Sequence, residues 1–238
     1  MTRVAVAVGA VGVLFAAGCG GGSSGSPSSP STTTTPVSVT AYAATDRIVG
    51  MNSLSDGEAN MVWYQGYLEV GHLYLGSSSG VRRRSTMASA LKFDLPSQVT
   101  GRTVTKATLR LYASEVRKDL TWVNPNGPTS SMTIQLRVSA FASNWDPASL
   151  TWNVWASLGT QGAGEAVATA PNTLKAVDFD VATIVRNWAA GTWPNFGMKL
   201  AADLYPDPGV DSYGITNFYS SVRYNTSDQR PQLIVEYQ

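Results

Sequence analysis

After Val37 the chain alternates between apolar and polar residues in one short segment after another. These segments are rich in Val, Ile, Thr, Tyr and Phe, and clusters of Gly, Pro, Asn, Asp and Ser separate them. A period of two belongs to a β-strand that buries one face and exposes the other. We therefore expect a chain built mainly from strands.

The alternation also indicates the fold class. In one segment, Leu109 and Leu111 fall on one face while Arg110 and Tyr112 fall on the other. Six segments show the pattern most clearly: Ala88–Leu95, Lys106–Ala113, Met132–Phe141, Leu174–Asp180, Gly197–Ala201 and Pro231–Tyr237. Half-buried strands without intervening helical patterns predict an all-β fold, an antiparallel β-sandwich of jelly-roll type with one short helix.

The short helix is expected over Val181–Ala190. Apolar residues recur there at i, i+3, i+4 and i+7, which places them on one stripe of a helix. Asp180 stands directly before it, where a carboxylate can accept the free backbone N–H groups of the first turn. Asp178 and Asp180 also form the only close carboxylate pair on a predicted strand, and a glycosidase needs two carboxylates about 5–9 Å apart. Capping is the favoured interpretation of Asp180.

The first 36 residues are not expected to belong to the folded domain. Arg3, an apolar run and small residues predict a signal peptide over residues 1–18, and the run is too short to span a bilayer permanently. Ala16-Ala17-Gly18-Cys19 resembles a bacterial lipobox, so we expect lipidation of Cys19; the alternative is a plain signal peptide beside an incidental cysteine. Residues 19–36 then form the lipidated cysteine and a Gly/Ser/Pro/Thr tether, and residues 37–238 form the domain.

Composition excludes several classes of function. The net charge is +1, and Arg3 is the only charge in residues 1–36, so the domain is neutral and should not attract nucleic acid or an anionic membrane surface. One Cys and one His exclude a disulfide framework, a Cys-rich zinc site and a Cys/His catalytic pair. A Pro-rich segment contains Asp203, Asp207 and Asp211. Their carboxylates either bind a structural calcium ion or belong to an ordinary solvated loop.

Aromatic residues have two interpretations, as core or as stacking platforms for sugar rings. Trp145, Trp152 and Trp188 are expected in the core, because Trp188 lies on the helix stripe and the other two belong to a Trp-containing block. Five aromatics in loop-like stretches are the candidates for exposed platforms: Trp63, Tyr64, Tyr67, Trp122 and Trp193.

Cations on strands give the sharpest binding pattern. Four of them alternate with core residues: Lys92, Arg110, Arg137 and Lys199. If their strands are neighbours in one sheet, the cations and Tyr112 line one surface, and like charges side by side favour an anionic partner. The alternative is that they are dispersed and paired with Asp94, Glu236 and other acids.

The order of several short blocks resembles a known family. They are FDL at 93–95, TxAxLRLY at 105–112, TW at 151–152, DVxxxVxxW at 180–188, NxGxxL at 195–200 and RPxLxVxY at 230–237. This order is similar to the DNRLRE domain, which overlaps carbohydrate-binding module family 96 and the disaggregatase-related domains; the resemblance covers roughly residues 42–237. It implies a β jelly roll, secretion or surface display, and frequent attachment to polysaccharide-degrading enzymes. The chain departs from the family at Val222-Arg223, where an acidic residue is usual.

Together these features predict a non-catalytic, surface-displayed carbohydrate-binding module for anionic polysaccharide. The expected ligand-binding residues are Lys92, Arg110, Tyr112, Arg137 and Lys199. No cofactor is expected other than a structural calcium ion, and the only membrane partner is the N-terminal lipid anchor at the bacterial cell surface or outer membrane. The alternatives are a structural or adhesive surface protein without a sugar site, and a polysaccharide lyase or hydrolase. Unpaired cations on the polar faces would favour the binding module.

Overall fold

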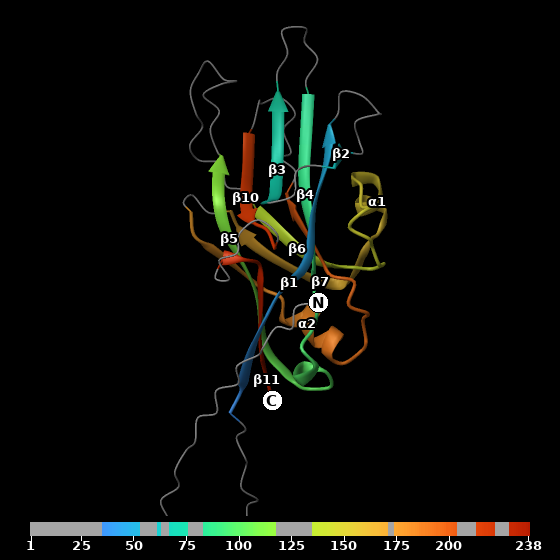
Figure 1. The fold of residues 1–238 in the computed structure, drawn as a ribbon, viewed down its shortest axis with the longest axis vertical. Helices are drawn as coiled ribbons and strands as arrows, with labels where there is room; N and C mark the ends of the chain where they lie inside the picture. Colours follow the sequence, from blue (N-terminus) through green and yellow to red (C-terminus); the bar gives the residue numbers. More distant parts are fainter. Residues whose placement is uncertain are drawn as a thin grey trace, which may run out of the picture. The chain divides into compact units, whose positions relative to one another are not determined.

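Antiparallel strands make up most of the structure. The computed structural model describes residues 35–52, 61–62, 67–75, 83–117, 135–170, 174–203, 213–221 and 229–238. The strands of this part are β1 (Val37–Asn52), β2 (Met61–Val62), β3 (Tyr67–Leu75), β4 (Arg83–Phe93), β5 (Val104–Arg117), β6 (Gln135–Phe141), β7 (Thr160–Thr169), β8 (Ala176–Asp180), β9 (Met198–Ala202), β10 (Tyr213–Tyr219) and β11 (Gln232–Tyr237) (Figure 1). The predicted all-β antiparallel sandwich is confirmed.

Two long strands connect the layers of the sandwich. β1 pairs with β11 along Val37–Tyr42 and, after an irregularity at residues 43–45, with β4 as far as Asn52. β5 likewise pairs with β8 and β11 as far as Tyr112 and with β10 beyond it. One layer therefore holds β8, β11 and the first parts of β1 and β5, whereas β4, β9, β6 and β7 follow one another in the other layer.

The hydrophobic core lies between these layers. Leu109 and Leu111 of β5 are fully buried in the same cluster as Leu91 of β4 and Leu200 of β9. Each fully buried side chain of this kind contributes roughly 1.5–3 kcal/mol relative to an exposed one. Because strand side chains alternate, the neighbours of these leucines are turned away from the core, as the sequence pattern predicts.

Two helices complete the described part. α2 (Ala182–Ala189) confirms the predicted helix and buries Ile184, Val185 and Trp188. The structure adds α1 (Trp152–Ser157), whose first turn is capped by Thr151: the threonine Oγ1 accepts the N–H of Val154 at 3.4 Å. α1 covers a second, smaller cluster. That cluster contains Val49, Ala88, Ala90, Phe141, Trp145 and Leu150, with Trp152 and Trp155 packed against it.

The Gly-rich strand β7 explains why Trp193 is not a free platform. A side chain at Gly162, whose φ is +54°, would collide with the indole of Trp193, and Gly164 lies against the same ring. The two glycines therefore leave room for Trp193, which is half-buried and packs against the core. The expectation of an exposed Trp193 is corrected, whereas Trp145 and Trp188 are buried as expected.

Several predicted features lie outside the described residues. They are the signal peptide, Cys19, the tether as far as residue 34, Trp63, Tyr64, Trp122, Asp207 and Asp211. Tyr67 begins β3, but its side chain is not described. In the part that is described, no helix has both the length and the apolar character needed to cross a membrane.

Candidate functional site

The residues predicted to bind ligand lie on two faces rather than one. Arg110 and Tyr112 project from β5 on the side opposite Leu109 and Leu111. We term this side of β1, β11, β5 and β8 the β5 face. It consists of Ser38, Thr40, Tyr42, Lys106, Thr108, Arg110, Tyr112, Ala176, Asp178, Asp180, Gln232, Ile234 and Glu236.

The other three predicted residues share the opposite layer. Lys92, Lys199 and Arg137 project from β4, β9 and β6, which pair in that order, and we term this side of the three strands and of β1 the β9 face. Both faces are turned away from the same core. A single surface holding all four cations is therefore wrong, because β5 pairs with β8 and β11 instead of β4, β6 or β9.

Lys92 is held by polar and aromatic groups of the segment before α1. Its Nζ donates to Asn144 Oδ1 at 2.8 Å and to the backbone oxygen of Trp145 at 2.6 Å, and it lies 4.6 Å from the Trp145 ring centroid. Burial lowers the pKa of Lys92, while the charge of Asp146 acts in the opposite direction. These contacts fasten the segment to β4.

Arg137 and Lys199 of the β9 face have contrasting surroundings. Arg137 pairs with Asp203 through two guanidinium nitrogens and with Glu165 at 2.6 Å, and these bonds raise its pKa. Lys199 is only 7% exposed, and its Nζ lies 4.4 Å from the Trp155 ring centroid and 5.3 Å from that of Phe141. Burial lowers the pKa of Lys199.

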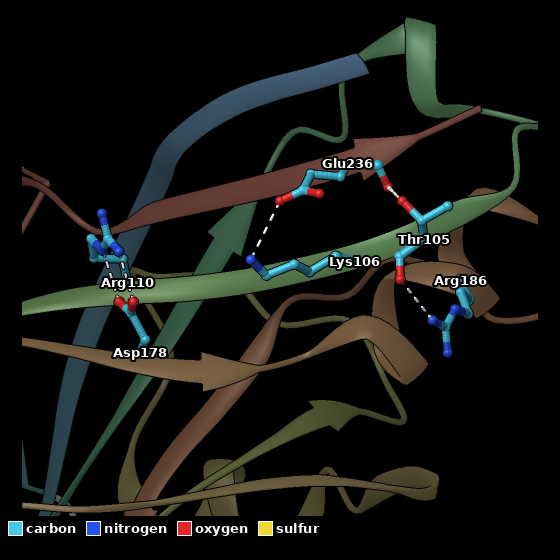
Figure 2. Close-up of polar contacts among 6 residues, drawn as sticks. All are labelled: Thr105, Lys106, Arg110, Asp178, Arg186 and Glu236. Carbon is cyan, nitrogen blue, oxygen red and sulfur yellow. Dashed lines mark hydrogen bonds and ion pairs between the residues drawn. The ribbon is translucent and has the colours of Figure 1, made fainter. Parts of the chain in front are cut away.

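On the β5 face, a row of paired residues crosses four strands. In the strand register, Tyr42 of β1 lies opposite Gln232 of β11, Gln232 lies opposite Arg110 of β5, and Arg110 lies opposite Asp178 of β8. Figure 2 shows the two parallel bonds from Arg110 Nε and Nη2 to the Asp178 carboxylate, at 2.8 and 2.7 Å. These bonds raise the pKa of Arg110, with a smaller contribution from Tyr112, and they lower the pKa of Asp178.

A polar cavity adjoins this face at the start of β5. Lys106 lies 3.4 Å from Glu236, and Arg186 Nη2 donates to the backbone oxygen of Thr105 at 3.1 Å (Figure 2). The cavity has a volume of about 400 Å³, within the range of small-ligand sites. Its polar lining comes from β5, β7, β8 and α2: Thr105, Lys106, Glu165, Asp180, Thr183 and Arg186.

Tyr42 and Arg230 are candidates that the sequence analysis missed. The guanidinium carbon of Arg230 lies 4.4 Å from the centroid of the Tyr42 ring, and Tyr42 is 38% exposed. Arg230 Nε is buried and has no hydrogen-bond partner, and no carboxylate among the described residues pairs with this side chain. The sequence feature that could have identified Arg230 is its place at the start of the RPxLxVxY block, directly before the strand that pairs with β1.

The acidic residues of the β5 face already have partners. Asp178 and Asp180 share one side of β8, as expected, but Asp178 binds Arg110 and Asp180 Oδ1 accepts the N–H of Ala182 at 3.0 Å. The N-cap residue of α2 is Val181, and Asp180, which precedes it, caps the first turn of the helix. Among the described residues, no group of three or more His, Cys, Asp or Glu could hold a metal ion.

Comparison with known proteins adds a family. The model of carbohydrate-binding module family 96 matches residues 67–236. The matched segment runs from β3 into β11 and includes Arg110, Asp178 and Arg230, whereas β1 precedes it. No curated protein matches the chain.

Proposed function

Because the chain belongs to carbohydrate-binding module family 96, we propose that its β5 face binds an anionic polysaccharide without cleaving it. The family accounts for carbohydrate as the ligand. The choice of face and the anionic character of the polymer are argued from the residues of the β5 face. Of the residues predicted from sequence, Arg110 and Tyr112 belong to this surface.

The observation that carries the anionic preference is the state of Arg230. Its guanidinium stacks on Tyr42 and has no acidic partner among the described residues, and its Nε is buried without an acceptor. A guanidinium presents a planar set of donors that matches a carboxylate, and a neighbouring aromatic ring offers a surface to the apolar side of a sugar. Arg230 and Tyr42 together therefore suit a uronate residue.

Arg110 extends this surface along the same row. Asp178 holds its guanidinium in one orientation through two short bonds, so little side-chain entropy remains to be lost when a ligand binds. Tyr112 follows on the same strand and the same face. The row offers a polymer a sequence of donors and rings rather than an enclosed pocket.

The state of Asp178 and Asp180, the carboxylate pair of β8, supports binding without hydrolysis on the β5 face. A glycosidase needs one carboxyl group with a raised pKa to donate a proton. Arg110 instead lowers the pKa of Asp178, and Asp180 is engaged as a helix cap. Export and lipid attachment through Cys19 form part of the same proposal, and they would display the module at the cell surface.

A binding comparison tests the proposal. Uronate polymers such as alginate should bind better than neutral glucans, and binding should weaken as salt rises because charges are screened within about 10 Å at 0.1 M. Arg230→Ala and Arg110→Ala should each weaken affinity by roughly 1.5–3 kcal/mol, whereas Arg110→Lys should recover part of the loss. Titration calorimetry against defined oligosaccharides measures each of these affinities.

Arg137→Ala is the matched control, because it removes a paired arginine from the β9 face. If Arg137→Ala weakens binding while Arg230→Ala and Arg110→Ala do not, the polysaccharide lies on the β9 face. Equal affinity for neutral and acidic polymers would remove the anionic preference. A protein that binds no polymer on a glycan array would favour the structural or adhesive alternative.

A further inference from the structure

At the β9 face, two buried hydrogen-bond donors and the ammonium of a buried lysine lack an acceptor among the described residues. Arg47 Nε and Trp155 Nε1 are buried without a hydrogen-bond partner. The ammonium of Lys199 contacts the rings of Trp155 and Phe141, and neither a hydrogen bond nor an ion pair reaches it from the described residues. Buried donors are rarely left unsatisfied, so this group points to a missing acceptor.

The strand register brings these groups to one place. Arg47 of β1 pairs with Ala90 of β4, and Ala90 pairs with Lys199 of β9. Strands lie about 4.8 Å apart, so the backbones of Arg47 and Lys199 are roughly 10 Å apart and their side chains share one face. Ala90 between them is small, and α1, which carries Trp155, packs against β1.

The neighbouring carboxylates are engaged elsewhere. Asp46 is next to Arg47 in sequence and therefore points to the other face, where it accepts the backbone N–H of Ser221. Glu165 continues the row beyond Lys199 and Ser139, but it binds Arg137, as does Asp203. Lys199 is buried and Arg47 is half-buried, and no carboxylate of the described residues pairs with either, in contrast to Arg110 and Arg137. Burying a charge without a partner is costly.

We propose that Arg47, Lys199 and Trp155 form a binding site for one oxyanion group, a carboxylate, sulfate or phosphate. The two cations supply the opposite charge, and the indole N–H of Trp155 supplies a directed hydrogen bond. The site lies in the other layer from the β5 face and does not depend on polysaccharide binding there. The group reaches it either as a free ion or as the acidic substituent of a bound glycan.

Thermal unfolding of the full chain in sulfate tests the site. Low-millimolar sodium sulfate, compared with sodium chloride at equal ionic strength, should raise the unfolding temperature of the wild type with a saturable dependence. Lys199→Met should abolish this rise. Lys175→Met, which removes an exposed lysine just before β8, should keep it. Sulfate also stabilises proteins without binding, so an equal rise in all three proteins, or none, overturns the proposal.

A second variant, Trp155→Phe, tests the site if Lys199→Met does not fold. Trp155→Phe keeps an aromatic ring above Lys199 but deletes the indole N–H, and it should weaken sulfate binding about tenfold. Binding is followed by tryptophan fluorescence in Arg47→Met and wild type, and by the unfolding temperature in Trp155→Phe. Unchanged sulfate affinity in both variants overturns the site.

A competition experiment with an oligouronate shows whether the bound oxyanion group is a free ion or a substituent of a glycan. If the acidic group of a glycan occupies the site, the oligouronate competes with sulfate and Lys199→Met weakens its binding. If a free ion occupies the site, the oligouronate leaves sulfate binding unchanged. Arg230→Ala affects only the β5 face, so failure of the polysaccharide proposal and failure of the oxyanion site give different patterns.

Discussion

At the scale of single residues, two of the cations predicted for one surface occur in opposite electrostatic settings. Arg110 donates two hydrogen bonds to Asp178, and these bonds lower the pKa of that carboxylate. Lys199 has only aromatic rings beside its ammonium, and burial lowers its pKa. The charge of the first residue has an opposite charge beside it in the folded state, whereas burial of the second residue opposes its charged form.

A pH series should reveal the cost of the Lys199 charge. Its folded pKa lies below the ordinary 10.5, so between these two values the unfolded chain binds more protons than the folded one. The free energy of unfolding should therefore rise with pH in that window. Urea titrations between about pH 8 and 10.5, without oxyanions, measure the rise.

Lys199→Met should flatten this dependence. Lys92 also has a pKa lowered by burial, so part of the slope should remain in the Lys199 variant. A wild-type stability that falls across the same window would contradict the assignment to Lys199.

Residue orientation was predictable from sequence, but residue partners were not. Alternation placed Arg110 and Lys199 on polar faces, and both side chains are turned away from the core. Asp178, which pairs with Arg110, is 68 residues away along the chain, and no local pattern identifies it. Lys199 is buried because α1 and its aromatic residues cover that part of the sheet. Alternation predicted the side of the strand on which Lys199 lies, but it did not predict that a helix would cover that side.

At the scale of elements, the junction between β8 and α2 joins a sheet to a helix without a loop. Val181 alone separates them, and Asp180 Oδ1 accepts the N–H of Ala182. The 3.6-residue period predicted α2 correctly. α1 was missed because six residues are too few to display a period, and β7 because its Gly and Ala residues have low strand propensity.

Removal of the Asp180 cap should destabilise the domain moderately. Asp180→Ala should reduce the free energy of unfolding by about 1 kcal/mol, because a first-turn N–H loses its acceptor. Asp180→Asn, which keeps an oxygen acceptor, should restore most of it. Denaturant unfolding gives both values, and glycan binding by the folded fraction should persist. A large loss of binding at unchanged stability would instead give Asp180 a role in the site.

At the scale of the whole molecule, long-range pairing decides which surfaces exist. β1 and β5 each pass from one layer to the other, so the two faces lie on opposite sides of one core. The sandwich class followed from alternation, but the order of strands depends on contacts between distant segments. For this reason the sequence predicted one surface for four cations, whereas the fold places Arg110 on the β5 face and the other three on the β9 face.

The proposed anchor belongs to this scale because it fixes where the whole domain is displayed. Cys19→Ser should release the protein from the membrane fraction, since acylation needs the thiol. Cell fractionation followed by immunoblotting distinguishes the variant from the wild type. Continued membrane attachment of Cys19→Ser would rule out a lipid anchor at this residue.

The pairing of β1 with β11 also has a mechanical consequence. The chain enters the sandwich at Val37, opposite Tyr237, and runs along β11 to Tyr42, where Arg230 stacks on the ring. A pull on the segment before Val37, resisted by a polymer held at Arg230 beside the start of β11, acts along the strand axis from opposite ends of the β1–β11 pair. The hydrogen bonds of the ladder, which are perpendicular to the strands, then bear the load together in shear instead of opening one after another. With the proposed anchor before Val37 and the proposed polysaccharide site at Arg230, tension between cell and polymer would load this ladder in shear.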